Sequence, residues 1–116
     1  MYDDNNIFAK IIRKEIPCQP VYEDAKVLFF NDINPKAKIH ILGLPKNSVI
    51  NLREFITSTD SDTFKYFFDK TLEVIKSFGL DKSGYRLITN DGENGNQEIP
   101  HFHIHILGGE NLGGLR

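Results

Sequence analysis

The sequence predicts an α+β domain with an antiparallel sheet of about five strands. Short apolar runs between turn residues are typical of strands, and one long segment repeats its apolar residues with a helical period. The strand-like runs also lie too close together for helical crossovers between parallel strands. With 116 residues, 40% of them apolar and nine of them Phe, the chain can bury one hydrophobic core. We therefore expect one domain over residues 1–116.

A short helix is expected near the N-terminus. Asn5 or Asn6 can cap its start, and Pro17 is expected to stop it. Apolar side chains recur on one side of this helix at Ile7, Phe8, Ile11 and Ile12.

Five strands are expected from short apolar runs bounded by turn residues. The first two form a hairpin around Asp24-Ala25, and the third lies between the turn Asn34-Pro35 and Pro45. The last two enclose a polar loop, residues 90–100, which has almost no apolar side chain. The strands are expected over residues 21–23, 27–31, 38–44, 85–89 and 102–107.

A long helix is expected between the third and fourth strands. Ser61 is expected to cap its start and Gly79 to follow its end. Its apolar face is formed by Phe64, Phe67, Phe68, Thr71, Leu72, Ile75 and Phe78.

Composition narrows the choice of partners and compartment. The formal net charge is −2 and no long basic run occurs, which disfavours nucleic acid as a partner. The single cysteine, Cys18, allows no intrachain disulfide and favours a reducing compartment. No apolar run approaches the roughly 20 residues of a membrane-spanning helix, and the start does not resemble a signal peptide. The sequence therefore predicts a cytoplasmic protein that does not bind membranes.

Three of the four histidines alternate with apolar residues, at His101, His103 and His105. Alternate residues of a strand face the same side, so we expect three imidazoles on one face, about 6.6 Å apart, with Phe102 and Ile104 turned toward the core. The same pattern would suit a solvated strand face, or a zinc site completed by His40 or a carboxylate.

Acid–base and nucleophilic chemistry at phosphorus fits the histidine strand better than either alternative. Neighbouring imidazoles cannot all be protonated, so one stays neutral and nucleophilic while another can hold a proton. An imidazole that attacks phosphorus needs such a pair. The polar loop before the strand could add backbone N–H groups for a phosphate.

Residues 101–109 resemble the signature of the histidine-triad (HIT) family, in which three histidines alternate with apolar residues. Residues 7–17, 30–40 and 90–98 are similar to the Hint branch of that family. The resemblance covers residues 7–109 and leaves a short tail at 110–116. It implies a HIT-type domain that pairs as a homodimer and hydrolyses a purine nucleoside phosphoramidate. The implied reaction requires no metal, although a bound zinc ion is compatible with the resemblance.

The resemblance also implies a role for each matching residue. His103 corresponds to the nucleophile that forms a nucleotidyl intermediate, and His105 to the residue that contacts phosphate and assists the leaving group. His101 corresponds to a triad member that pairs with His40. The substrate positions are Asp32 at the ribose, Ile7, Phe8, Phe30 and Ile33 around the base, and Asn90, Asn96, Gln97 and Glu98 in the phosphate loop.

Two of these loop residues depart from the family pattern. Asn96 stands where glycine is common, and asparagine tolerates left-handed backbone geometry better than most residues. Glu98 stands where some members have serine, which implies a different preference for the leaving group. Two other functions stay open: hydrolysis of dinucleoside polyphosphates, and regulation by a nucleotide-binding module in which turnover is incidental.

Overall fold

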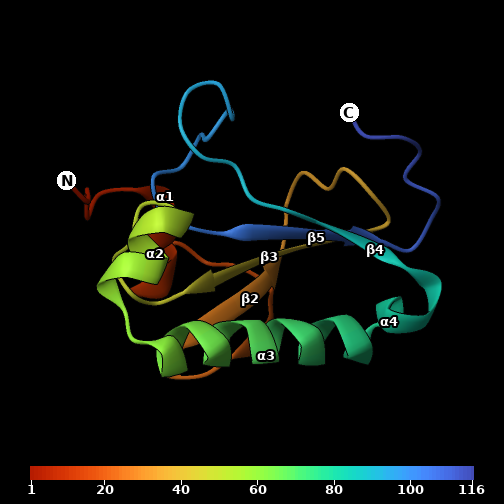
Figure 1. Ribbon diagram of the computed structural model, residues 1–116, viewed down its shortest axis with the longest axis horizontal. Helices are drawn as coiled ribbons and strands as arrows, with labels where there is room; N and C mark the ends of the chain where they lie inside the picture. Colours follow the sequence, from red (N-terminus) through yellow and green to blue (C-terminus); the bar gives the residue numbers. More distant parts are fainter.

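Five strands form one antiparallel sheet in the computed structural model, which describes residues 1–116 (Figure 1). The predicted α+β class is therefore confirmed. The sheet order places β5 between β3 and β4, because the helical connection after β3 crosses one face of the sheet. In spatial order the strands are β1 (Pro20–Glu23), β2 (Val27–Asn31), β3 (Ile39–Pro45), β5 (Ile104–Gly108) and β4 (Tyr85–Ile88).

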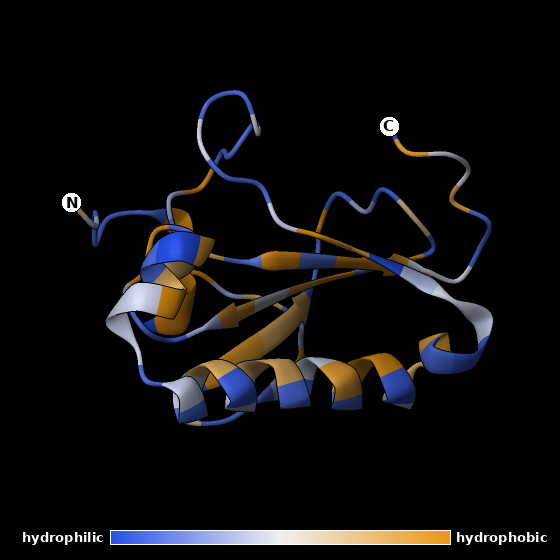
Figure 2. Ribbon diagram, viewed as in Figure 1, coloured by the Kyte–Doolittle hydropathy of each residue, from blue (hydrophilic) through white to orange (hydrophobic).

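The long helix α3 (Ser61–Ser77) covers one face of the sheet (Figure 1). Figure 2 shows its hydrophobic side turned toward the strands and its hydrophilic side turned outward. The Asp60 side chain caps α3 by accepting from Thr63 N–H, so the cap expected at Ser61 is wrong by one residue. Gly79 follows the helix with φ +72°, as predicted for a residue that must adopt a left-handed conformation. None of the helices combines the length and the apolar character that a membrane-spanning helix needs.

Three shorter helices complete the fold. Asn6 caps α1 (Ile7–Ile12), and this helix ends well before Pro17 because Lys14 adopts a left-handed φ of 67°. The sequence did not predict α2 (Leu52–Ser58) or α4 (Leu80–Ser83).

The two faces of the sheet carry separate groups of buried side chains. On the α3 face, Phe29 stacks on Phe67 and Phe55 stacks on Phe102. On the opposite face, α1 packs over Phe30 and Leu42 but leaves part of the sheet uncovered. Loops 32–38 and 89–103 rise from that same uncovered face (Figure 1). The uncovered part is where the predicted site residues gather.

The histidine strand begins two residues later than expected. β5 starts at Ile104, and the β4 ladder ends where Ile88 pairs with His105. Phe102 N–H instead donates to Val49 O, and the Thr89 hydroxyl donates to His103 O. These bonds hold residues 101–103 outside the ladder, so the expected strand over 102–107 is correct only from residue 104.

Asp24 fastens the β1–β2 hairpin to α3. Its carboxylate accepts from the N–H groups of Lys26 and Val27, at 2.8 and 2.9 Å, and from the hydroxyls of Tyr22 and Tyr66. Burial alone would raise the pKa of Asp24, but these hydrogen bonds outweigh it and lower the pKa to about 2.

Asp24→Asn should destabilise the fold by about 1–3 kcal/mol at pH 7, because an amide cannot accept all four bonds. Because the pKa is depressed in the folded protein, the wild-type carboxylate contributes its full stabilisation at pH values above about 3.9, the pKa of an aspartate in the unfolded chain. This contribution is lost as the pH falls toward 2. Thermal unfolding of both proteins from pH 7 to pH 2 tests this. A difference in Tm that stayed constant down to pH 2 would contradict the role of Asp24.

Candidate active site

A cleft of about 620 Å³ opens on the sheet face opposite α3, between α1 and the loops 32–38 and 89–103. His101 and Gln97, both predicted at the site, do not line it. The other predicted site residues do: His40, His103, His105, Asp32, Ile33, Phe30, Ile7, Phe8, Asn90, Asn96 and Glu98.

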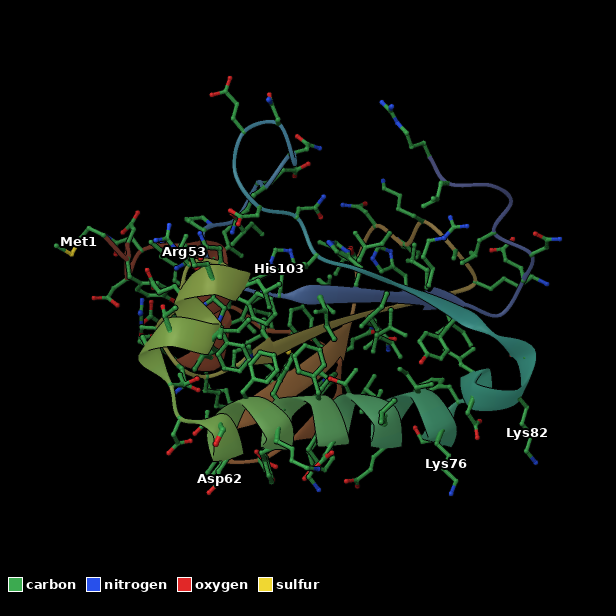
Figure 3. All side chains as sticks on the ribbon, viewed as in Figure 1. Met1, Arg53, Asp62, Lys76, Lys82 and His103 are labelled. Atoms are coloured by element: carbon green, nitrogen blue, oxygen red, sulfur yellow. The ribbon has the colours of Figure 1, made fainter.

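His103 immediately precedes β5, on the side of the sheet away from α3 (Figure 3). Its Nδ1 is 2.7 Å from the carbonyl oxygen of His101. A carbonyl can only accept, so Nδ1 carries the proton and the lone pair is on Nε2. The Phe8 ring meets the imidazole edge-on, with centroids 4.8 Å apart. The His103 ring is therefore fixed as a neutral base with Nε2 as its free nitrogen.

His40 and His105 form a second fixed pair. Lys36 N–H donates to His40 Nδ1 at 3.0 Å, so the His40 proton is on Nε2. His40 Nε2 lies 2.9 Å from His105 Nδ1 and 3.4 Å from Asp32 Oδ2. His105 Nδ1 accepts the shorter bond, which leaves a proton on His105 Nε2. The rings of His103 and His105 are 5.1 Å apart, so the cleft holds a free lone pair next to an N–H donor.

The pairing of His40 with His101 that the resemblance implied is wrong. In the β3–β5 register His40 is opposite Leu107 and Leu42 is opposite His105, so His40 and His105 are diagonal neighbours on one face. His101 precedes the strand and is fully buried behind His103. Its Nε2–H donates to Pro45 O at 2.8 Å. The three imidazoles therefore do not form the evenly spaced row that we expected.

Burial lowers the pKa of all four histidines. It lowers the pKa of His101 to about 4, and burial with the nearby His103 and His40 lowers that of His105 to about 4. The pKa of His103 is also lowered by burial, which outweighs its bond to the His101 carbonyl. Burial lowers the pKa of His40 as well, although Asp32 opposes the shift. Burial therefore disfavours the imidazolium form at all four positions.

The loop before the histidines is stiffened by its own side chains. Asn90 Nδ2 donates to Gly95 O at 2.7 Å, and Gln97 Nε2 donates to Ile50 O at 2.7 Å. Gln97 therefore braces the loop from behind rather than facing the cleft. Asn96 adopts a φ of 58°, a left-handed conformation that asparagine tolerates. The N–H groups of Glu98 and Ile99 donate to no group of the chain, so they are free to bind an anion.

Several lining residues were not predicted. Ile11 and Ile16 extend the apolar end of the cleft, and the helical period had already placed Ile11 beside Ile7. Lys36 also lines the cleft, but nothing in the sequence indicates that its N–H orients His40.

Asp32, His40 and His105 are the residues of this site that could hold a metal ion, with ligand atoms within 4.8 Å of one another. Their hydrogen bonds do not suit zinc. A metal on His40 Nε2 would force the proton onto Nδ1, where it would face the donating N–H of Lys36 at 3.0 Å. The three residues therefore fit a chain of hydrogen bonds better than a metal centre.

The lowered histidine pKa values predict that stability falls below neutral pH. Between about 6.5, the ordinary histidine value, and about 4, the unfolded chain binds more protons than the folded one. The contribution of His101 and His105 is therefore complete above pH 6.5 and is lost as the pH falls to 4. Tm measured from pH 7.5 to 4 should fall, and His101→Asn should flatten the curve. An equally steep curve for this variant would contradict the neutral state of His101.

A sequence model of the HIT domain matches residues 13–112. A HIT-like protein of Rickettsia prowazekii is 50% identical and covers 99% of this chain and 96% of its own length. A 14 kDa zinc-binding protein of Zea mays is 43% identical over 95% of this chain and 86% of its own.

Solved structures give the same result. A HIT family hydrolase from Legionella pneumophila superimposes with a TM-score of 0.87 at 35% identity, over 94% of this chain and 96% of its own. A histidine triad nucleotide-binding protein from Candida albicans gives a TM-score of 0.78 at 30% identity, over 88% of this chain and 73% of its own. The chain therefore belongs to the HIT domain family.

Proposed function

We propose that this protein hydrolyses purine nucleoside 5′-phosphoramidates through a covalent nucleotidyl intermediate on His103. The observation that carries the proposal is the pair of fixed tautomers in the cleft: Nε2 of His103 bears a free lone pair, and Nε2 of His105 bears a proton. The relative named as a hydrolase supports hydrolysis, and the relative named as a nucleotide-binding protein supports a nucleotide ligand.

The apolar end of the cleft suits a nucleoside base. Phe8 and Phe30 are buried and pack edge to face, while Ile7 and Ile33 are exposed at the rim. Asp32 lies beside this end, and its carboxylate can accept hydrogen bonds from ribose hydroxyls. The phosphate would then reach the histidines, with the free N–H groups of Glu98 and Ile99 and one N–H of Asn90 as donors. Asn96 borders that entrance.

In the first step His103 Nε2 attacks the α-phosphorus and the phosphorus–nitrogen bond breaks. The anionic phosphate favours protonation of His105, so the substrate complex takes up one proton on His105 Nδ1, and the His40 Nε2–H that this nitrogen had accepted is left to Asp32 Oδ2, 3.4 Å away. His105 returns to neutral when its Nε2 proton passes to the departing amine. The product of this step is a nucleotidyl-imidazole on His103.

In the second step water attacks the same phosphorus and releases the nucleoside monophosphate. His105 Nε2 accepts the proton of the water, and the bond from His103 Nε2 to phosphorus breaks. His103 keeps its Nδ1 proton on the His101 carbonyl throughout. No metal enters either step, and the hydrogen bonds of Asp32, His40 and His105 do not favour one. The cytoplasmic location stays a prediction of the sequence.

A fluorogenic adenosine phosphoramidate, supplied in the presence of a chelator, tests the reaction. The wild-type protein should release the amine, and His103→Ala should lose at least 10³-fold in kcat, as expected when a nucleophile is removed. Rapid quenching should trap labelled nucleotide on the wild type only. Binding of AMP by His103→Ala, measured by calorimetry, is the control for an intact cleft.

Other outcomes of this assay would favour the alternatives. Full activity of His103→Ala would refute the covalent mechanism. Loss of wild-type activity in chelator, restored by zinc, would favour a zinc-dependent reaction, because the name of the Zea mays relative records zinc binding. Cleavage of diadenosine polyphosphates in place of the amidate would identify a polyphosphate hydrolase. Tight AMP binding with no turnover of either substrate would favour a regulatory module.

We also infer that two copies pair through β4. This strand is an edge of the sheet, and its Tyr85 and Leu87 are each about 40% exposed on the side of α3. Leu72 of α3 is 57% exposed. An unpaired edge strand with apolar residues along it is suited to pairing with a second copy across a two-fold axis.

Leu87→Glu should convert a dimer to a monomer in light scattering after size exclusion, because it places a charge in the paired edge. Ile56→Glu is the matched control, since Ile56 is 51% exposed but lies on α2, at the other end of the molecule from β4 (Figure 1). A wild-type monomer at micromolar concentration, or a dimer that survives Leu87→Glu, would refute the pairing.

A further inference from the structure

Tyr2 contacts a residue that follows it by 99 positions in the chain. Its hydroxyl lies 2.6 Å from His101 Nδ1, and the two rings meet edge-on with centroids 5.6 Å apart. His101 Nε2 already donates its proton to Pro45 O, so Nδ1 holds a lone pair and the tyrosine hydroxyl is the donor. His101 is fully buried, which leaves Tyr2 as the group that satisfies this nitrogen.

The His101 ring is fixed at both nitrogens, by Tyr2 on one side and by Pro45 on the other. The same residue supplies the carbonyl that takes the His103 Nδ1 proton at 2.7 Å. Residues 101–103 lie outside the β5 ladder, so the ladder does not hold this carbonyl in place. The orientation of the His103 ring therefore depends on what holds His101.

The segment that carries Tyr2 is itself tied to α1. Asn6 N–H and Asn6 Nδ2 both bind Asp3 O, and the Asn6 side chain caps α1. Arg13 reaches back from the end of the helix to Asp4 O at 2.8 Å. Tyr2 thus has a defined place next to His101, although it does not line the cleft.

We propose that Tyr2 is a positioning residue for the nucleophile: its hydroxyl holds the His101 ring, and the His101 carbonyl in turn orients the His103 imidazole. The proposal rests on the proposed function, because the rate it affects is that of phosphoramidate cleavage. Tyr2 does not touch the substrate, so its loss should lower kcat and leave KM unchanged.

Tyr2→Phe removes only the hydroxyl and keeps the ring. We expect kcat for the adenosine phosphoramidate to fall roughly three- to tenfold, the effect of losing one hydrogen bond, with KM unchanged within about twofold. Tyr22→Phe is the matched control, because it removes a similar hydroxyl bond, to Asp24 at 2.9 Å, away from the cleft. This control should leave kcat unchanged. The proposal would be overturned if Tyr2→Phe kept the kcat of the wild type, or if Tyr22→Phe lost as much kcat as Tyr2→Phe.

A double-mutant cycle shows whether Tyr2 acts through His101. If it does, adding Tyr2→Phe to His101→Asn should produce no further loss of kcat, because the bond it removes is already gone. Additive losses would overturn the proposal by showing that the hydroxyl acts elsewhere.

Nitrogen-15 NMR of the histidine rings separates this proposal from the proposed function. In Tyr2→Phe the His101 Nε2–H and the His103 Nδ1–H should exchange with solvent faster than in the wild type, and in Tyr22→Phe they should not. Absence of turnover by the wild type would refute the proposed function while this readout still decides the role of Tyr2. Unchanged exchange in Tyr2→Phe would overturn the positioning role.

Discussion

The hydrogen bond from His103 Nδ1 to the carbonyl of His101 is the interaction on which the candidate site depends. It decides which nitrogen of His103 faces a ligand, and it requires a carbonyl held at one place just before a strand. Phe102, which lies between His101 and His103, holds that carbonyl in place from the α3 side of the sheet. Its ring is buried against Phe55 and Phe67, and its N–H is bound to Val49 O. The core under α3 therefore helps to orient His103 on the opposite face of the sheet.

The protons of His101 and His40 are assigned in the same way, because each ring is bound to a backbone group that can act only as a donor or only as an acceptor. A backbone carbonyl can only accept and a backbone N–H can only donate, so Pro45 and Lys36 each leave one possible tautomer for His101 and His40. No buried side-chain nitrogen or oxygen lacks a partner. Each ring nitrogen that points into the protein has such a partner, and the two without one, Nε2 of His103 and Nε2 of His105, face the cleft, so the four imidazoles can be ordered close together. A neutral imidazole is also the form that can attack phosphorus, because one of its nitrogens carries a lone pair.

The sequence predicted the parts of this arrangement that follow from the repeat of apolar residues along a strand or a helix. Alternation in the strand placed His103 and His105 on one face, and the helical period placed Ile7 and Phe8 along one helix. The position of His101 depends on Val49 and Thr89, which lie far away in the chain, so alternation alone misplaced it. The contact of Tyr2 with His101 has the same non-local origin. The short helix α2 could have been recognised, because Asn51 caps it and Glu54 binds Ile50 N–H, a local signal of a helix start.

The helix α1 connects the two ends of the cleft. With six residues it is too short to be stable alone, so its position depends on the Asn6 cap and on packing against the sheet. Phe8 lies in this helix and contacts Phe30 at the apolar end as well as the imidazoles of His101 and His103. A base bound against Phe8 would therefore restrain the same ring that packs on the nucleophile. The proposed base site and the orientation of His103 therefore share the ring of Phe8, so a substitution of Phe8 reaches both at once.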